Sequence, residues 1–183
     1  MHKLLRPHPD SLGLAAARVE VTVTRPRADR LVLSYVVTGK ISDIRLPPTV
    51  PAARADGLWQ HTCFEAFVRA ASGPSYYEFN FAPSTEWAAY RFDSYRSGMG
   101  AAEIGTPEIE GRSNPDSYTL QASLELDRLP DLSREASWRL ALSALIEDQN
   151  GRMSYWALAH PPGKPDFHHA DSFALEFSPA VPS

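Results

Sequence analysis

The chain has 183 residues, of which 43% are hydrophobic and 22% are charged, and its formal net charge is -4 at pH 7. This composition is typical of a folded globular protein and excludes a disordered or fibrous chain. The acidic balance offers no basic surface to a phosphate backbone, so we expect no nucleic-acid partner.

The N-terminal stretch, MHKLLRPHPDSLGLAAA, carries charged residues and prolines where a secretory segment needs an uninterrupted apolar core. No later run approaches the length that crosses a bilayer. Cys63 is the one cysteine of the sequence, which excludes an internal disulfide and a thiolate metal cage. We therefore expect a cytoplasmic protein that has no membrane partner.

Nine short runs with strand-like composition follow one another, most of them separated by Pro, Gly, Ser, Asn or Asp. They are Ala17–Thr24, Arg30–Thr38, Thr62–Ala70, Tyr76–Phe81, Glu86–Asp93, Ser117–Leu126, Trp138–Ile146, Met153–Ala159 and Ser172–Phe177. The sequence contains no repeat or long linker at which a second domain would begin. We expect residues 1–183 to form a single domain, an all-β antiparallel β-sandwich of immunoglobulin-like or jelly-roll-like type, with about nine or more strands.

Two of these runs show the period of two that a half-buried strand requires. Valine alternates with Glu and Thr in residues 19–24, and Leu and Ala alternate with polar residues in 120–127. Trp138 and Trp156 lie on predicted strands and are expected in the core, because large aromatic residues dominate sandwich interiors.

The central runs predict a meander of three antiparallel strands joined by two tight turns, at residues 71–74 and 83–85. We expect Glu65 opposite Asn80, and Glu78 opposite Arg91. In this register one face is apolar and belongs to the core, and it holds Phe64, Ala66, Val68, Tyr77, Phe79, Phe81, Ala88, Tyr90 and Phe92. The opposite face displays Cys63, Glu65, Phe67, Glu78, Asn80, Trp87, Ala89 and Arg91.

The polar face of the meander suits a polyhydroxylated ligand. Carboxylates accept hydrogen bonds from sugar hydroxyls, Asn80 and Arg91 donate, and the indole of Trp87 can stack on the apolar face of a pyranose. The alternative is an ordinary charge cluster on a solvated sheet face, where each exposed pair contributes under about 1 kcal/mol.

A long loop before the last predicted strand gathers titratable groups, and loops of this kind often carry function. Its residues include His160, Lys164, Asp166, His168, His169 and Asp171. Adjacent histidines point in opposite directions along an extended chain and do not easily share one metal ion, so hydrogen-bonding roles are favoured over metal binding.

Two alternatives to saccharide binding remain open. Met99, Met153 and several histidines could supply axial ligands to haem, although the sequence has no CxxCH attachment motif. Met153 would otherwise fill core space. The second alternative is a glycoside-processing enzyme or a protein-interaction module.

For catalysis, Glu65 and Glu78 could act as an acid and nucleophile pair. We expect Arg91, opposite Glu78, to lower the pKa of that carboxyl, which opposes the raised pKa that a general acid requires. Cys63 and His61 could form a nucleophile and base, but no third group orients them and a buried cysteine is usually inert.

Three segments of the sequence resemble bacterial DOMON-like domain proteins, which are similar in turn to family-9 carbohydrate-binding modules. The segments are LWQHTCFEAFV (58–68), YYEFNFAPSTEWAAYRFDSYRSGM (76–99) and WALAHPPGKPDFHHADSFALEF (156–177). The matching positions are Trp59, Glu65, Phe79, Asn80, Pro83, Trp87, Pro165, Asp166, Phe167, His168 and Phe173. The resemblance implies a β-sandwich that binds sugars or haem through aromatic and polar residues of one sheet. The calcium that family-9 modules often hold is not expected here, because no Asp-rich loop is present.

We therefore predict a non-catalytic domain that binds a carbohydrate or sugar-like small molecule on one sheet face, without metal or cofactor, haem being the alternative. The predicted ligand-binding residues are Trp59, Glu65, Glu78, Asn80, Trp87, Arg91, His160, Lys164, Asp166 and His168.

Overall fold

The computed structural model describes residues 1–11, 15–133 and 135–178, and strands make up its regular structure apart from three short 3-10 turns. The strands are β1 (His2–Pro7), β2 (Ala16–Arg27), β3 (Arg30–Gly39), β4 (Cys63–Ala70), β5 (Tyr76–Phe81), β6 (Trp87–Phe92), β7 (Gly100–Ala101), β8 (Glu108–Ser113), β9 (Ser117–Glu125), β10 (Trp138–Glu147), β11 (Met153–Ala157) and β12 (Leu175–Phe177). The turns are η1 (Ile41–Asp43), η2 (Leu58–Gln60) and η3 (Ala170–Ser172). The predicted all-β class is confirmed.

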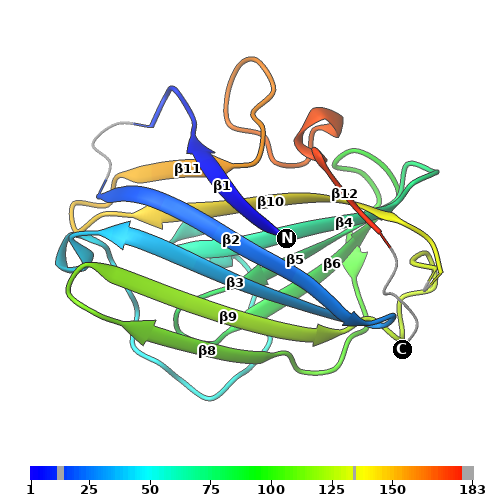
Figure 1. The fold of residues 1–183 in the computed structure, drawn as a ribbon, viewed down its shortest axis with the longest axis horizontal. Helices are drawn as coiled ribbons and strands as arrows, with labels where there is room; N and C mark the ends of the chain where they lie inside the picture. Colours follow the sequence, from blue (N-terminus) through cyan, green and yellow to red (C-terminus); the bar gives the residue numbers. More distant parts are fainter. Residues whose placement is uncertain (12–14, 134, 179–183) are drawn as a thin grey trace.

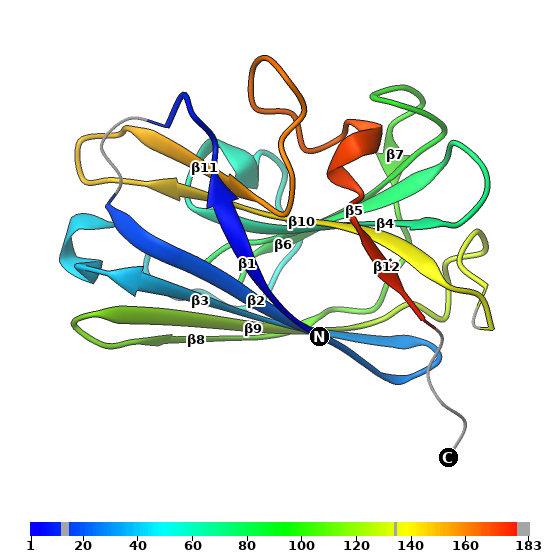
Figure 2. The ribbon, with the colours of Figure 1, turned by 45° about the horizontal axis from the view of Figure 1, so that its top comes forward.

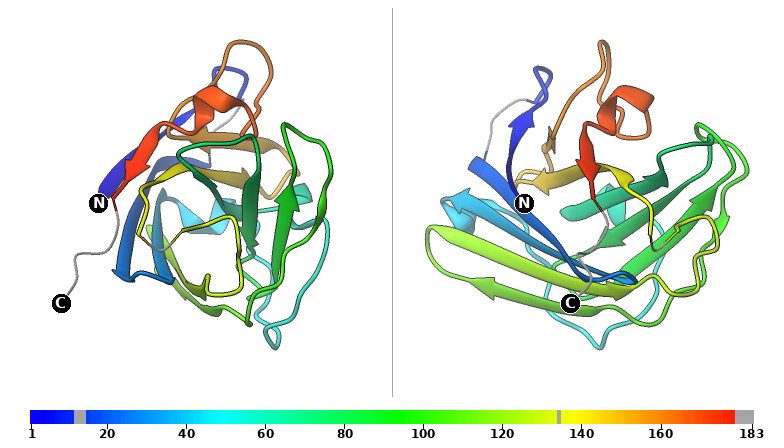
Figure 3. Two further views of the ribbon diagram at one scale, coloured as in Figure 1. Left: turned by 90° about the vertical axis from the view of Figure 1, so that its right-hand side faces the viewer. Right: turned by 45° about the vertical axis from the view of Figure 1, so that its right-hand side comes forward.

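All twelve strands belong to one antiparallel sheet with the order β7-β6-β5-β4-β10-β11-β1-β2-β3-β9-β8, and β12 pairs with β10. The sheet curls strongly, so that β2, β3, β8 and β9 face the layer of β4, β5, β6, β10 and β11 (Figures 1 and 3). Strand β1 joins the layers along one edge, because its first residues pair with β2 while Arg6 and Pro7 pair with β11.

The space between the two layers holds the main hydrophobic core. Alternate residues of each strand point inward, as the period of two requires. Fully buried side chains of this core include Val19, Val21, Leu33, Tyr35, Phe64, Phe79, Phe81, Leu120, Leu140 and Trp156. The predicted core positions of Trp138 and Trp156 are confirmed, with exposed fractions of 1% and 2%.

A second apolar cluster covers the outer face of the β4–β6, β10 and β11 layer. It contains Cys63, Phe67, Tyr76, Ala88, Tyr90, Phe92, Ala141, Leu145, Ala157, Phe167 and Phe173. Because the loop between β11 and β12 lies over this face, six consecutive residues of β4 (63–68) are buried whichever way they point. The candidate site lies within this second cluster.

All nine predicted strands are present, whereas β1, β7 and β8 were not predicted. Strand β1 reads HKLLRP and β8 reads EIEGRS, and neither sequence alternates between apolar and polar residues. Strand β7 has only two residues. These strands form through pairing with neighbours, for which a short sequence window carries no signal.

The predicted register of the meander is half right. Glu65 lies opposite Asn80, as predicted. Glu78, however, lies opposite Tyr90 and not Arg91. The turn between β5 and β6 holds three residues between the paired Ala82 and Glu86, and its last residue, Thr85, has φ +74°.

A left-handed residue at the end of a three-residue loop is usually glycine, and a β-branched residue there is rare. The hydroxyl of Thr85 donates to the backbone oxygen of Val50 at 2.6 Å, and this bond helps to hold the turn. The predicted turn at residues 83–85 is correct, but three residues in this turn place β6 one position away from the predicted register. Each side chain of β6 therefore lies on the face opposite to the predicted one. Tyr90 and Phe92 face outward, and Trp87 faces the main core.

The shifted register predicts unequal effects of removing two tryptophans. Trp87 is 6% exposed and belongs to the main core, whereas Trp59 is 40% exposed. We expect Trp87→Ala to lower the free energy of unfolding by about 3–5 kcal/mol, and Trp59→Ala by less than about 1 kcal/mol. Urea denaturation of both variants checks this. Equal losses would contradict the register.

Candidate functional site

A row of polar side chains crosses the middle of the outer face. Ser143 of β10 pairs with Glu65 of β4, and Glu65 pairs with Asn80 of β5. Glu78 precedes Asn80 by two positions and therefore lies on the same face. Apolar neighbours surround this row, so its polar groups are buried: Glu65 is 3% exposed, Glu78 5% and Asn80 0%. The alternative of an exposed charge cluster is therefore wrong.

A cavity of about 360 Å³ opens onto this row. Its lining combines two carboxyl groups, one imidazole and one guanidinium with aromatic and aliphatic walls. The lining residues are Trp59, Glu65, Glu78, Tyr90, Phe92, Arg96, Met99, Leu145, Tyr155, Pro165, Phe167 and His168. The volume lies at the lower end of the roughly 300–1,000 Å³ range of small-molecule pockets.

Glu65 lies at the base of the cavity in surroundings that disfavour a negative charge. The hydroxyl of Ser143 donates to its Oε2 at 3.1 Å, and Tyr35 donates to its backbone oxygen at 2.6 Å. Burial, together with the nearby Glu78, raises the pKa of Glu65 well above the ordinary 4.5. This environment favours the protonated form of the Glu65 carboxyl over the carboxylate.

Glu78 is held from one side by its neighbour on β5. The amide nitrogen of Asn80 donates to Glu78 Oε1 at 2.8 Å. Burial raises the pKa of Glu78 to about 7, although this hydrogen bond and Arg96 oppose the shift. Asn80 Oδ1 is buried without a donor among the described residues.

His168 reaches the cavity from the loop between β11 and β12. Its Nδ1 lies 2.8 Å from the hydroxyl of Tyr76, whose oxygen also accepts the backbone N–H of Arg96 at 3.2 Å. The phenol has one proton to donate, and Nδ1 of a neutral ring is the acceptor that the described residues place beside it. With this bond made, the imidazole proton lies on Nε2. Burial lowers the pKa of His168 to about 4, so the ring is neutral at pH 7.

The Nε2 atom of His168 faces Glu78 Oε2 at 3.7 Å. This distance is too long for a hydrogen bond, and with a neutral ring the contact is not an ion pair. One oxygen atom of a ligand could lie within hydrogen-bond distance of both groups.

Two loops close over the cavity and are bonded to each other. The loop after β6 and the loop between β11 and β12 rise on the same side of the sheet (Figure 2). Asp166 accepts from Arg96 at 2.9 Å and from the hydroxyl of Tyr95 at 2.5 Å. Its Oδ1 also accepts the backbone N–H of His168 at 3.1 Å. Asp166 thus fixes both the loop that carries Arg96 and the loop that carries His168.

The mouth of the cavity is aromatic and partly exposed. The rings of Trp59 and Tyr90 meet edge to face with centroids 6.2 Å apart. The hydroxyl of Tyr90 donates to Asp56 at 2.6 Å, which ties the ring to the segment that carries Trp59. Trp59 and Met99 remain 40% and 55% exposed, so their surfaces are free to contact a ligand.

Four of the ten predicted site residues line this cavity: Trp59, Glu65, Glu78 and His168. Two more, Asn80 and Asp166, support it from behind and from the side. The cavity thus brings together predicted residues from β4, β5 and the loop between β11 and β12.

The predicted positions of Trp87 and Arg91 on this face are wrong, because β6 pairs one residue away from the predicted register. Trp87 is buried in the main core, where the guanidinium of Arg54 lies 5.7 Å from its ring. Arg91 lies on the opposite face and donates to Asp131 at 2.7 Å. The predicted lowering of the carboxyl pKa by Arg91 is therefore wrong as well, and burial raises it instead.

His160 and Lys164 do not line the cavity. His160 Nε2 lies 2.8 Å from the backbone oxygen of Arg6, and its ring packs against His8. Lys164 is exposed on the loop. Cys63 is fully buried, and burial raises the pKa of its thiol well above the ordinary value, while His61 contacts Glu147. These contacts give no support to a cysteine nucleophile.

Sequence reasoning missed the residues of β6 and of the loop that follows it. Tyr90, Phe92, Arg96 and Met99 line the cavity. Strand β6 reads WAAYRF, with large residues on both parities, so alternation could not assign its faces. Arg96, with φ +51°, turns toward the cavity from a loop, where no periodicity exists to place it.

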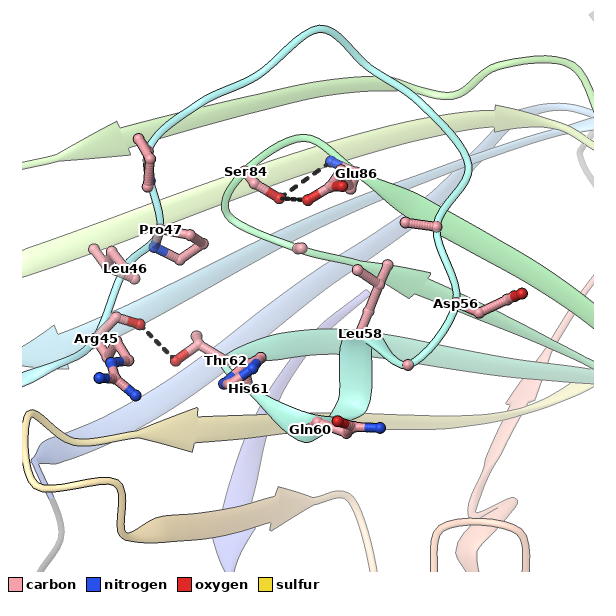
Figure 4. A pocket seen from close by; sticks show the side chains of 14 residues that line it. Arg45, Leu46, Pro47, Asp56, Leu58, Gln60, His61, Thr62, Ser84 and Glu86 are labelled. Carbon is pink, nitrogen blue, oxygen red and sulfur yellow. Dashed lines mark hydrogen bonds between the residues drawn. The ribbon is translucent and has the colours of Figure 1, made fainter.

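Figure 4 shows a second cavity, of about 630 Å³, between the loop that begins at Arg45 and the β5–β6 turn. Arg45 and His61 both contact Glu147 at 2.8 Å, and Ser84 donates to Glu86 at 2.8 Å. Its polar groups thus bind one another. None of the predicted site residues lines it.

Across the described ranges, no group of three or more His, Cys, Asp or Glu side chains could hold a metal ion. Within the same ranges, no helix is long and apolar enough to span a membrane.

No protein-family model and no curated protein matches the sequence. Solved structures, however, share the fold. A candidate carbohydrate-binding protein from Bacteroides uniformis ATCC 8492 matches with TM-score 0.68 and 14% identity, over 97% of this chain and 84% of that chain. A family-9 carbohydrate-binding module from Caldicellulosiruptor kristjanssonii, in complex with glucose, matches with TM-score 0.54 and 13% identity, over 98% and 86%.

A family-9 module from the same organism, in complex with cellotriose, matches with TM-score 0.54 and 14% identity, over 89% of this chain and 74% of that chain. This chain has the fold of a family-9 carbohydrate-binding module. The predicted resemblance is confirmed for the fold. Sequence identities of 13–14% show a shared fold and do not show a shared function.

The buried carboxyl groups predict a pH-dependent stability. Folding keeps a proton on Glu78 between its ordinary pKa of 4.5 and about 7, so its contribution to stability is present below pH 4.5 and is lost as the pH rises through 7. His168 has the opposite effect, because burial lowers its pKa. Its contribution to stability is present above pH 6.5 and is lost as the pH falls toward 4.

We therefore expect Glu78→Gln to gain stability relative to the wild type as the pH rises from about 4.5 to about 8, by up to about 3 kcal/mol. Denaturant unfolding over this pH range measures the difference. Glu110→Gln, at an exposed residue of β8, shows the effect of removing a surface carboxylate. A difference for Glu78→Gln that does not vary with pH would contradict the raised pKa.

Proposed function

We propose that the protein binds a neutral saccharide in the cavity lined by Trp59, Glu65, Glu78 and His168. The observation that carries this proposal is the combination of two buried carboxyl groups, whose pKa values burial raises, with an exposed tryptophan at the mouth of one cavity. Polar groups at the base recognise hydroxyls, and the aromatic rim contacts the apolar face of a pyranose.

The charge of the cavity favours a neutral ligand. Arg96 is the cation of the lining, and its guanidinium is paired with Asp166 at 2.9 Å. His168 is neutral, and burial raises the pKa of both lining carboxyls. An uncharged sugar meets donors and acceptors in this site without bringing an unpaired charge into a buried space.

The fold comparisons support the same ligand class. One solved neighbour is a module in complex with glucose and another is in complex with cellotriose. The prediction that the chain is not an enzyme remains a prediction, and one of its grounds, the expected effect of Arg91 on Glu78, no longer applies.

Calorimetric titration with glucose, cellotriose and other neutral sugars tests the proposal. We expect binding by the wild type and a loss of affinity of about fivefold or more in Trp59→Ala, because an aromatic contact contributes about 1 kcal/mol beyond burial. Trp87→Phe is the matched control, since that ring lies on the opposite face. We expect it to bind like the wild type.

Absence of binding across the sugars would contradict the proposal, as would loss of binding in Trp87→Phe alone. Haemin belongs in the same titration, because Met99 and His168 line one cavity and are both residue types that ligate haem. A Soret band formed by the wild type and lost in His168→Ala would favour haem over a saccharide.

A further inference from the structure

Two carboxyl groups share one cavity but stand in different surroundings. Glu65 on β4 is opposite Asn80, and Glu78 is two residues before Asn80 on β5, so the two glutamates are diagonal neighbours on one face. Diagonal positions are about 7–8 Å apart at Cα, which lets both side chains reach one small group between them. Both line the cavity.

In each carboxyl group one oxygen accepts a hydrogen bond from a neighbouring side chain, and the other oxygen remains for a group bound between the two glutamates. Glu65 Oε2 accepts from Ser143, and Glu78 Oε1 accepts from Asn80. Glu78 Oε2 faces His168 Nε2 across 3.7 Å. A carbon atom that carries two oxygens, such as the anomeric carbon of a reducing sugar, could present one oxygen to each glutamate.

We propose that this cavity opens and recloses the ring of a bound reducing sugar, with Glu78 as the base for the anomeric hydroxyl and Glu65 as the acid for the ring oxygen. The inference rests on the proposed saccharide binding and adds an acid–base activity to it. By this activity the protein accelerates the interconversion of the α and β anomers of the sugar.

The step balances without a cofactor. The anomeric O–H bond breaks and its proton passes to the Glu78 carboxylate, while the Glu65 proton passes to the ring oxygen. The bond between the anomeric carbon and the ring oxygen breaks, and its electron pair stays on the ring oxygen as the open-chain aldehyde forms. Closure on the other face of the aldehyde returns both protons and restores the starting state of the two glutamates.

The different environments of the two groups fit these roles. Burial raises the pKa of Glu65 well above its ordinary value, which favours its acid form, and it raises the pKa of Glu78 to about 7, so near neutral pH Glu78 is present in both forms and can accept a proton. His168 Nε2–H, fixed by Tyr76, is a donor to the anomeric oxygen and acts as a positioning residue.

Polarimetry of freshly dissolved α-D-glucose, with and without the protein, tests the inference. We expect the wild type to accelerate the approach to the equilibrium rotation, and Glu78→Gln to lose about 10²-fold of this acceleration, the usual contribution of one general acid–base group. Glu65→Gln is a second variant with the same expectation. Leu4→Ala, at an exposed residue of β1 outside the cavity, is the control and should keep the wild-type rate.

Calorimetry with the same proteins separates this inference from the proposed function. Glucose binding without acceleration would overturn the ring-opening activity and leave saccharide binding intact. Absence of glucose binding together with an unchanged rate would overturn the inference as well as the proposed site for this sugar. Methyl α-D-glucopyranoside has a methoxy group in place of the anomeric hydroxyl and cannot give up that hydroxyl proton. We therefore expect it to bind and to inhibit the reaction competitively. Acceleration that persists in both glutamine variants would overturn the assigned roles.

Discussion

Burial of Glu65 and Glu78 on the outer face of a sheet layer is the constraint on which the site depends. A carboxylate in apolar surroundings is costly, so these groups keep protons or share hydrogen bonds with Ser143 and Asn80. The free-energy cost of charging these carboxyls arises because the outer face of the layer is covered. Phe67, which lies on that face beside the glutamates, is only 1% exposed. Without that cover the two side chains would be ordinary surface charges with no distinctive chemistry.

The cover is assembled from segments distant in the sequence. Asp166 bonds the loop after β6 to the loop before β12, and Tyr76 links His168 to the backbone of Arg96. Because Tyr76 belongs to the same strand as Glu78, the strand that buries the carboxyl also sets the tautomer of the imidazole that faces it. The burial of the polar groups and their orientation thus have a common origin in one pair of loops.

The fold was largely predictable, and the site in part. Strands that alternate, such as 19–24, can be read from local pattern, and Glu65 opposite Asn80 followed from a short turn. The faces of β6 could not be read, because its large residues occupy both parities and a change of one residue in the register inverts them. The pKa directions of the glutamates could not be read either, since they depend on the loops that exclude water.

Carbon-13 NMR of the glutamate side-chain carboxyls, followed through a pH titration, tests the central claim most directly. Glu65→Gln and Glu78→Gln assign the two signals by their disappearance. The account predicts that the Glu78 signal titrates near pH 7 and that the Glu65 signal titrates well above the ordinary value of 4.5. Midpoints for both near the ordinary value of 4.5 would contradict it, and would show that water and charge reach these side chains freely.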